Sequence, residues 1–253
     1  MKNIIFHKLY LTLGFFLIIN NAFAFDGFIK NKGQFPNQVL AKKKINGGAL
    51  FVEQGKMVFS FYNQKQLKKF HDNKNRDSKI NFHSYSMTFR NISKNISVSY
   101  NNKYDYVENY YLGEKQNWAS NVPIFNELLQ ENIYKGIDLR IYNQHENLKY
   151  DLILSKSADV NEVIMKYQQV ESLTLVNGSL LIQTSVNTIN EMRPYAYQII
   201  NNDTVEVKCD YVVKKHTVGF KFPKGFNPNY SVVIDPTLIF STYSGSISDN
   251  FGY

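Results

Sequence analysis

The chain contains 253 residues, of which 43% are hydrophobic, 15% aromatic and 20% charged, and this composition excludes a chain that is disordered throughout. Enough apolar material is present for one sizeable core or two small ones. The formal charge of +8 is a mild basic excess, which is ordinary for a soluble domain rich in lysine and asparagine and gives no strong indication of an acidic partner.

The first 24 residues have the order of a secretory signal peptide. Lys2 and Lys8 form a short basic region, an apolar run extends from Leu9 to Ile19, and cleavage is expected after Ala24. The run is shorter than the roughly 20 residues of a membrane-spanning helix, so no membrane span is expected. Removal of this segment lowers the charge from +8 to +6. The sequence therefore predicts a secreted protein that is extracellular or on the outer cell surface.

Short runs with the alternation of β-strands follow one another after the signal peptide. In the first half they cover residues 39–44, 49–53, 56–62, 84–89, 96–100, 106–112, 138–142 and 148–154. Two segments depart from this pattern. Residues 64–81 are charged and lack a continuous apolar face, which predicts a long exposed loop, and Asp159 is placed to cap a single helical turn within 158–163.

The second half predicts hairpins more clearly. Asn177 and Gly178 tolerate the positive φ angles of a type I′ turn, and they join predicted strands at 172–176 and 179–184. Further strands are expected at 197–200, 204–214, 217–222 and 231–234. The alternation within 204–214 places Cys209, the only cysteine, on the inward face, and one cysteine cannot form an intrachain disulfide. We therefore expect an all-β fold, an antiparallel β-sandwich or two packed sub-sandwiches, stabilised by its core.

Several motifs, taken in chain order, resemble those of one known domain. They are FIKNKGQ at 28–34, GGALF at 47–51, WASNVP at 118–123, YKGIDLR at 134–140, LKYD at 148–151, RPYAYQ at 193–198 and VIDP at 233–236. Together they resemble the N-terminal β-rich domain of uncharacterised function (DUF7948-like) of secreted Bacteroidota proteins. The resemblance implies an architecture and a location, and it supplies no catalytic or ligand-binding residues.

Residues 237–253 resemble the opening of a different module. LIFSTYSG at 238–245 and DNFGY at 249–253 are similar to the start of an SBBP repeat, a β-propeller-like unit that commonly follows such a domain. The expected organisation is a signal peptide at 1–24, a β-sandwich domain at 25–236 and the truncated start of a repeat at 237–253. Such proteins are often exported by the type IX route and carry sorting domains that engage gliding and adhesion machinery, so the resemblance implies a longer parent chain.

Candidate catalytic and metal-binding groups are few. The five histidines are scattered without the spacing of a metal site, and no phosphate loop, nucleophile elbow or calcium loop occurs, so no metal or cofactor is expected. Asp138, Glu146 and Asp151 are the best candidates for a glycosidase pair at the end of a hairpin. Opposite charges alternate at 138–140 and 149–151, however, and this pattern favours cross-strand ion pairs on the solvated face of the sheet over catalysis.

The aromatic residues offer one candidate binding site. A dense group could stack sugar rings, and it comprises Tyr100, Tyr104, Tyr106, Tyr110, Tyr111 and Trp118. Most of these are more simply core or strand-pair residues, so Trp118, in a predicted loop before Pro123, is the candidate for ligand stacking. The lysines at 42–44 and within 64–81 are not interleaved with aromatics, so no nucleic-acid partner is expected. Asp203-Thr204-Val205 resembles a Bacteroidota O-glycosylation acceptor, which makes Thr204 a candidate modification site.

Functions of different classes remain open at this point. The favoured hypothesis is a non-catalytic structural or interaction module of a secreted cell-surface or adhesion protein, which presents downstream repeats and meets a protein or glycan partner. The alternative is a carbohydrate-binding β-sandwich that uses Trp118. A glycoside-active enzyme comes third, and it would use Asp138 and Asp151.

Overall fold

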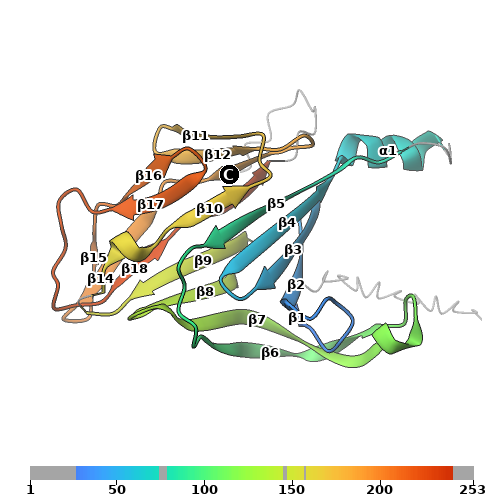
Figure 1. Cartoon of the computed structure of the whole chain (residues 1–253), viewed down its shortest axis with the longest axis horizontal. Coiled ribbons are helices and arrows are strands. Elements are labelled where there is room, and N and C mark those ends of the chain that lie inside the picture. Colours follow the sequence, from blue (N-terminus) through green and yellow to red (C-terminus); the bar gives the residue numbers. More distant parts are fainter. Residues whose placement is uncertain (1–26, 74–78, 145–146, 157, 242–253) are drawn as a thin grey trace, which may run out of the picture.

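The computed structural model describes residues 27–73, 79–144, 147–156 and 158–241 (Figure 1). The predicted signal peptide, with its cleavage site at Ala24, lies outside these residues. Glu146 and residues 242–253 of the predicted repeat also lie outside them. Those expectations stay predictions.

Most of the strands form one antiparallel sheet, which has 15 strands and which Figure 1 shows to be bent rather than flat. In chain order its strands are β1 (Phe28–Lys30), β2 (Val39–Ile45), β3 (Gly48–Glu53), β4 (Lys56–Tyr62), β5 (Phe82–Phe89), β6 (Ser97–Tyr110), β7 (Ala119–Tyr134), β8 (Ile137–Gln144), β9 (Asn147–Leu154), β10 (Met165–Gln168), β14 (Tyr195–Ile200), β15 (Asp203–Glu206), β16 (Asp210–Lys214), β17 (Thr217–Lys221) and β18 (Val232–Asp235). Their spatial order is β15-β14-β18-β9-β8-β7-β1-β2-β3-β4-β5-β10-β17-β16, and β6 pairs with β7 beside this path.

A second, smaller sheet has four strands in the order β11-β12-β13-β19. They are β11 (Ser172–Val176), β12 (Ser179–Gln183), β13 (Thr188–Glu191) and β19 (Leu238–Ser241). Apolar side chains of both sheets belong to one buried core. The ring of Phe240 on β19, for example, lies 6.2 Å from that of Phe59 and 5.8 Å from that of Phe61, both on β4. The expected all-β fold is therefore confirmed, as two sheets of unequal size.

Residues 64–81 are not the long loop that their charges predict, because they begin with a helix, α1 (Gln64–Asn73). Asn63 caps this helix: its Oδ1 accepts a hydrogen bond of 3.1 Å from the backbone N–H of Gln66, and its carbonyl accepts one of 3.0 Å from Leu67. Lysine and glutamine also have high helix propensity. Among the described residues, no helix is both long and apolar enough to cross a membrane.

The single helical turn expected near Asp159 is confirmed as a short 3-10 helix, η2 (Val160–Glu162). The Asp159 carboxylate accepts a hydrogen bond of 2.9 Å from the backbone N–H of Asn161. The predicted turn between β11 and β12 is also present, since Asn177 and Gly178 have φ angles of 51° and 85°. Positive φ at both positions is the signature of a type I′ hairpin.

Two of the expected strand divisions differ from the observed ones. Two strands were expected within residues 96–112, where the structure has one, β6, which pairs with the slightly longer β7 over most of its length. The run 204–214 was expected as one strand and is divided into β15, which pairs with β14, and β16, which pairs with β17. The division falls at residues 207–209, where the backbone N–H of Val207 donates to the carbonyl of Ala196 at 2.8 Å. The chain therefore passes here from one edge of the large sheet to the other.

Candidate functional site

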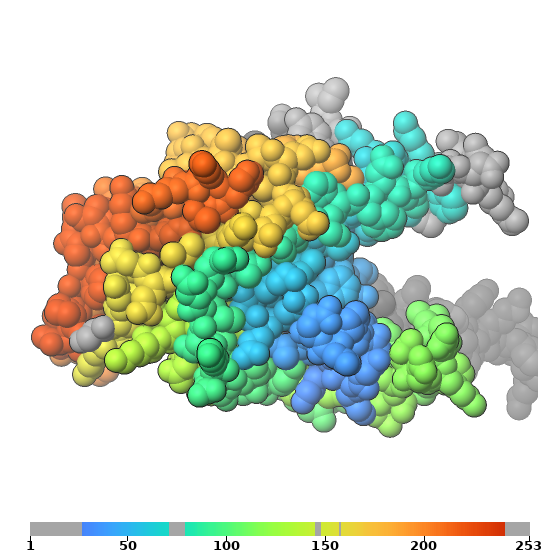
Figure 2. Space-filling view, viewed as in Figure 1, coloured from blue at the N-terminus to red at the C-terminus, as the bar shows by residue number. Residues whose placement is uncertain are grey.

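The predicted stacking residue Trp118 lies at the far end of the β6–β7 hairpin, in a segment that we call the hairpin tip (residues 111–118). Figures 1 and 2 show this end projecting from the body of the molecule. Three large apolar side chains are exposed there: Trp118 has an exposed fraction of 42%, Tyr111 of 56% and Leu112 of 80%. Apolar side chains gathered on a projection are available to a binding partner.

Contacts within the hairpin tip hold the indole ring of Trp118 in place. The rings of Trp118 and Tyr111 meet edge to face, with their centroids 5.4 Å apart. The indole N–H donates to the carbonyl of Gly113 at 3.3 Å, and the ammonium of Lys115 lies 6.0 Å from the ring centroid. Gly113 has a φ of 70°, which glycine adopts without strain. The tip therefore presents a supported aromatic surface with a cation over the indole ring.

The other tyrosines of the predicted aromatic patch are bound into the hairpin and do not form an open platform. Tyr104, Tyr106 and Tyr110 pack against a small second core of Ile29, Ala119, Val122 and Ile124. The hydroxyl of Tyr110 donates to Glu108 at 2.6 Å, and burial together with this contact raises the pKa of the phenol. The hydroxyl of Tyr100 donates to the carbonyl of Leu40 at 3.0 Å.

The predicted carboxylates are occupied by contacts within the sheet. Asp151 on β9 is opposite Arg140 on β8, and its buried carboxylate accepts hydrogen bonds from Nε and Nη2 of that arginine. Burial raises the pKa of Asp151, and the Arg140 contacts oppose this rise. The carboxylate of Asp138 accepts a hydrogen bond of 2.7 Å from the backbone N–H of Asn132. The expected cross-strand ion pair is present between Arg140 and Asp151, but the expectation that it lies on a solvated face is wrong, because Asp151 is buried.

Lys149 also forms an ion pair, with a partner outside the β8–β9 hairpin. Its ammonium lies 2.7 Å from a carboxylate oxygen of Asp235 on β18. Among the described residues, no group of three or more histidine, cysteine, aspartate or glutamate side chains is arranged to hold a metal ion.

The sequence did not indicate the most buried acid of the described chain, Glu191 at the end of β13. Its side chain has no exposed surface, and its carboxylate accepts three phenolic hydrogen bonds. Tyr150 on β9 donates at 2.5 Å, Tyr211 on β16 at 2.8 Å and Tyr167 on β10 at 2.9 Å. Burial raises the pKa of Glu191, and the three hydrogen bonds oppose this rise. We call Glu191 and these three tyrosines the tyrosine cage; it joins the small sheet to the large one.

The sequence did contain a signal for this cage. Glu191 lies two positions after Ile189 and therefore on the same face of the strand, and Ile189 is an obvious core residue. A carboxylate on the inward face of a strand requires buried hydrogen-bond donors, and tyrosine hydroxyls are donors that a core can hold.

Two further residues from the sequence analysis can be placed. Cys209 is buried as expected. Burial, and to a smaller extent the negative charge of Asp210, raises the pKa of its thiol to about 12. A thiol with so high a pKa is protonated at neutral pH and is a poor nucleophile. Thr204 is exposed on β15, opposite Ile199 of β14, where an attached glycan would meet solvent.

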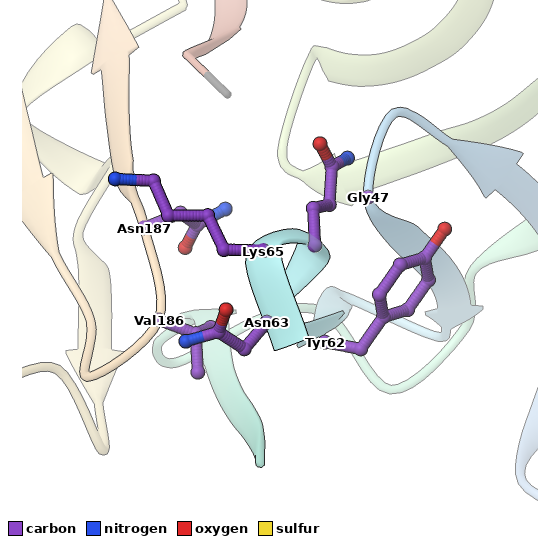
Figure 3. Close-up of a pocket in the computed structure, with 7 residues that line it drawn as sticks. Gly47, Tyr62, Asn63, Lys65, Val186 and Asn187 are labelled. Atoms are coloured by element: carbon purple, nitrogen blue, oxygen red, sulfur yellow. The ribbon is translucent and has the colours of Figure 1, made fainter. Parts of the chain in front are cut away.

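A small pocket of about 170 Å³ lies at the start of α1 (Figure 3). Its walls come from three separate parts of the chain: the β2–β3 turn, the start of the helix and the link between β12 and β13. The residues that line it are Gly47, Tyr62, Asn63, Gln64, Lys65, Val186 and Asn187. Two of the polar side chains that line it already form hydrogen bonds within the protein: the Gln64 amide donates to Asn46 at 3.1 Å, and Asn63 caps the helix.

Comparison with known proteins gives one match. The sequence model of one protein family, a domain of unknown function named DUF7948, matches residues 28–237. No curated protein and no solved structure matches the chain.

Proposed function

We propose that this chain, which belongs to the DUF7948 family of domains of unknown function, is a non-catalytic interaction module of a secreted cell-surface protein. In this proposal the hairpin tip makes the contact with a protein partner. The observation that carries it is the exposure of Tyr111, Leu112 and Trp118 together at the end of one projecting hairpin. The signal peptide pattern of residues 1–24 supports the extracellular location.

Apolar side chains that are exposed to water favour burial against a partner. Burying exposed aliphatic and aromatic surface is favourable by about 25 cal/mol per Å², and tryptophan and tyrosine are enriched among residues that dominate interfaces. The aromatic pair at the tip is already held in place by its own contacts. A partner therefore gains this burial without ordering the two rings, which favours binding.

A photo-crosslinking side chain at position 112 of the full chain tests the proposal on cells that produce and export it. The matched control carries the same group at position 176, because Val176 is also an exposed apolar residue (45%) at a hairpin end. We expect a discrete protein adduct from position 112 only, and we expect Trp118→Ala to lower its yield at least about tenfold. Equal adducts from both positions, or none from position 112, would overturn the proposal.

The carbohydrate-binding alternative is favoured by one observation, the partial exposure of the Trp118 ring together with the Lys115 ammonium that lies over it. An aromatic ring of this kind can stack on a sugar ring, as it stacks on other flat apolar faces. A glycan array probed with the full chain separates the two functions. Binding that Trp118→Ala abolishes would assign the tip to a glycan, and no binding would leave the protein partner.

A glycoside-active enzyme has the weakest support, because Asp151, one of its two candidate carboxylates, is buried and forms an ion pair with Arg140. Turnover of a glycosidase substrate that is lost in Asp138→Asn or Asp151→Asn would contradict the non-catalytic proposal.

A further inference from the structure

A second surface cleft, distant from the hairpin tip, lies where the two edges of the large sheet approach each other. It has a volume of about 630 Å³. The residues that line it come from the start of β14, from the link between β15 and β16, and from the loop after β17; they are Arg193, Pro194, Tyr195, Glu206, Val207, Lys208, Cys209 and Lys224. Figure 1 shows β14 and β15 at the opposite end of the molecule from the hairpin tip.

Positive charge predominates in this cleft. Lys208 and Lys224 are exposed, and within the described part of the chain neither ammonium forms an ion pair. Arg193 also lines the cleft, with its guanidinium held 2.8 Å from the carboxylate of Asp210. Glu206 is the one carboxylate of the lining. Unpaired cations at the wall of a cleft attract an anionic ligand, because part of the field is shielded from solvent there.

The cleft also has an aromatic wall and an apolar floor. Tyr195 has an exposed fraction of 43%, and its ring stacks on that of Tyr197 with centroids 5.7 Å apart. This contact restricts the Tyr195 side chain before any ligand arrives. Pro194, Val207 and Cys209, which also line the cleft, are buried. An exposed ring with such a contact, beside apolar lining residues, suits the flat face of a sugar ring.

We propose that this cleft binds an acidic oligosaccharide, one whose sugar rings carry carboxylates. The Tyr195 ring stacks on a sugar ring, while Lys208 and Lys224 bind the carboxylates and Glu206 accepts sugar hydroxyls. A cleft of this volume falls within the range of small-ligand sites. This inference does not depend on the proposed function, because the residues of the two surfaces are different.

Calorimetric titration of the full chain with a linear oligogalacturonate tests this site. The matched neutral probe is the same oligomer with its carboxyls methyl-esterified, and inorganic phosphate serves as an anion without a sugar ring. We expect binding of the acidic oligomer only. Each of Lys208→Gln and Lys224→Gln should weaken it about three-fold to ten-fold, and Tyr195→Ala should weaken it by about as much or more, whereas Tyr195→Phe should retain it.

Lys103→Gln is the control for general charge attraction, because Lys103 is an exposed lysine on β6, away from the cleft. Its affinity for the oligomer should equal that of the wild type. An equal loss in Lys103→Gln, equal binding of the esterified oligomer, full competition by phosphate at similar concentration, or no binding of the acidic oligomer would each overturn the proposal. Thermal unfolding of every variant shows whether the fold is intact.

Discussion

The hydroxyl of Tyr150 on β9 donates a 2.5 Å hydrogen bond to the carboxylate of Glu191 on β13, and both side chains are completely buried. β9 belongs to the large sheet and β13 to the small one, so this contact crosses the interface between the two layers. A hydrogen bond to a charged or partly charged group in a low-dielectric core is stronger than one in water. The tyrosine cage therefore fixes where the small sheet sits on the large one.

Removing the carboxylate of Glu191 should destabilise the fold strongly. Glu191→Ala leaves the buried hydroxyls of Tyr150 and Tyr167 without an oxygen acceptor, removes one of the two acceptors of Tyr211, and opens a cavity. We expect a loss of about 3–5 kcal/mol in the free energy of unfolding. Glu191→Gln keeps one acceptor oxygen and the shape of the side chain, so it should remove about one hydrogen bond. The expected loss in the free energy of unfolding is therefore about 1–2 kcal/mol. Urea unfolding measures both. An Ala variant as stable as the Gln variant would show that the cage carries little of the stability.

The raised pKa of Glu191 makes a testable prediction about pH. The folded state holds this proton more tightly than the unfolded chain, whose glutamate keeps its ordinary pKa of 4.5. The contribution of Glu191 to stability is therefore greatest below that pH and declines as the pH rises through the raised pKa. We expect the free energy of unfolding of the wild type minus that of Glu191→Gln to fall across this window. A difference that rises with pH would mean that the tyrosine hydrogen bonds outweigh burial.

Tyr85 provides a contrast to the cage. Its ring stacks on Phe59 with centroids 4.9 Å apart, yet its hydroxyl is buried and has no hydrogen-bond partner among the described residues. Tyr85→Phe removes an unsatisfied polar group and should raise the free energy of unfolding by about 0.5–1 kcal/mol. Tyr167→Phe instead removes a 2.9 Å bond to Glu191 and should lower it by about 1–2 kcal/mol. Both variants losing stability equally would contradict this distinction.

The strand β19 should contribute to the stability of the domain although it follows the end of the family match at residue 237. Leu238 is 3% exposed and its neighbour Ile239 is 43% exposed, because adjacent residues of a strand point to opposite faces. We expect Leu238→Ala to cost about 2–4 kcal/mol, and Ile239→Ala to change stability by less than about 0.5 kcal/mol. Thermal unfolding of the two variants compares them directly. Similar small effects would show that β19 is not needed by the fold.

Sequence periodicity located those strands that have one buried face. β4, for example, was expected at its observed bounds, Lys56–Tyr62, because buried and partly exposed residues alternate along it. β7 was missed because Asn121, Pro123 and Asn126 interrupt its apolar pattern, and its burial depends on β1 and β6 on either side. A strand whose neighbours come from distant segments carries a weak local signal.

Of the candidate sites, one could be found from local sequence and two could not. Trp118 was found from residue type and loop position, which local sequence can supply. The tyrosine cage was not, because Tyr150, Tyr167 and Tyr211 come from strands that meet only in the folded core. The cleft beside Tyr195 was missed for a related reason: the apparent single strand at 204–214 breaks at residues 207–209, and this break forms part of the wall.

The sequence by itself determined that the chain is rich in β-strands, that a type I′ turn lies at Asn177 and Gly178, and that Cys209 faces inward, because each follows from short-range periodicity or from allowed backbone angles. Only the tertiary structure decided that the strands form two unequal sheets, that a buried carboxylate joins them, and which aromatic and basic side chains remain exposed. Those properties depend on contacts between residues far apart in the chain, and no local pattern specifies such contacts.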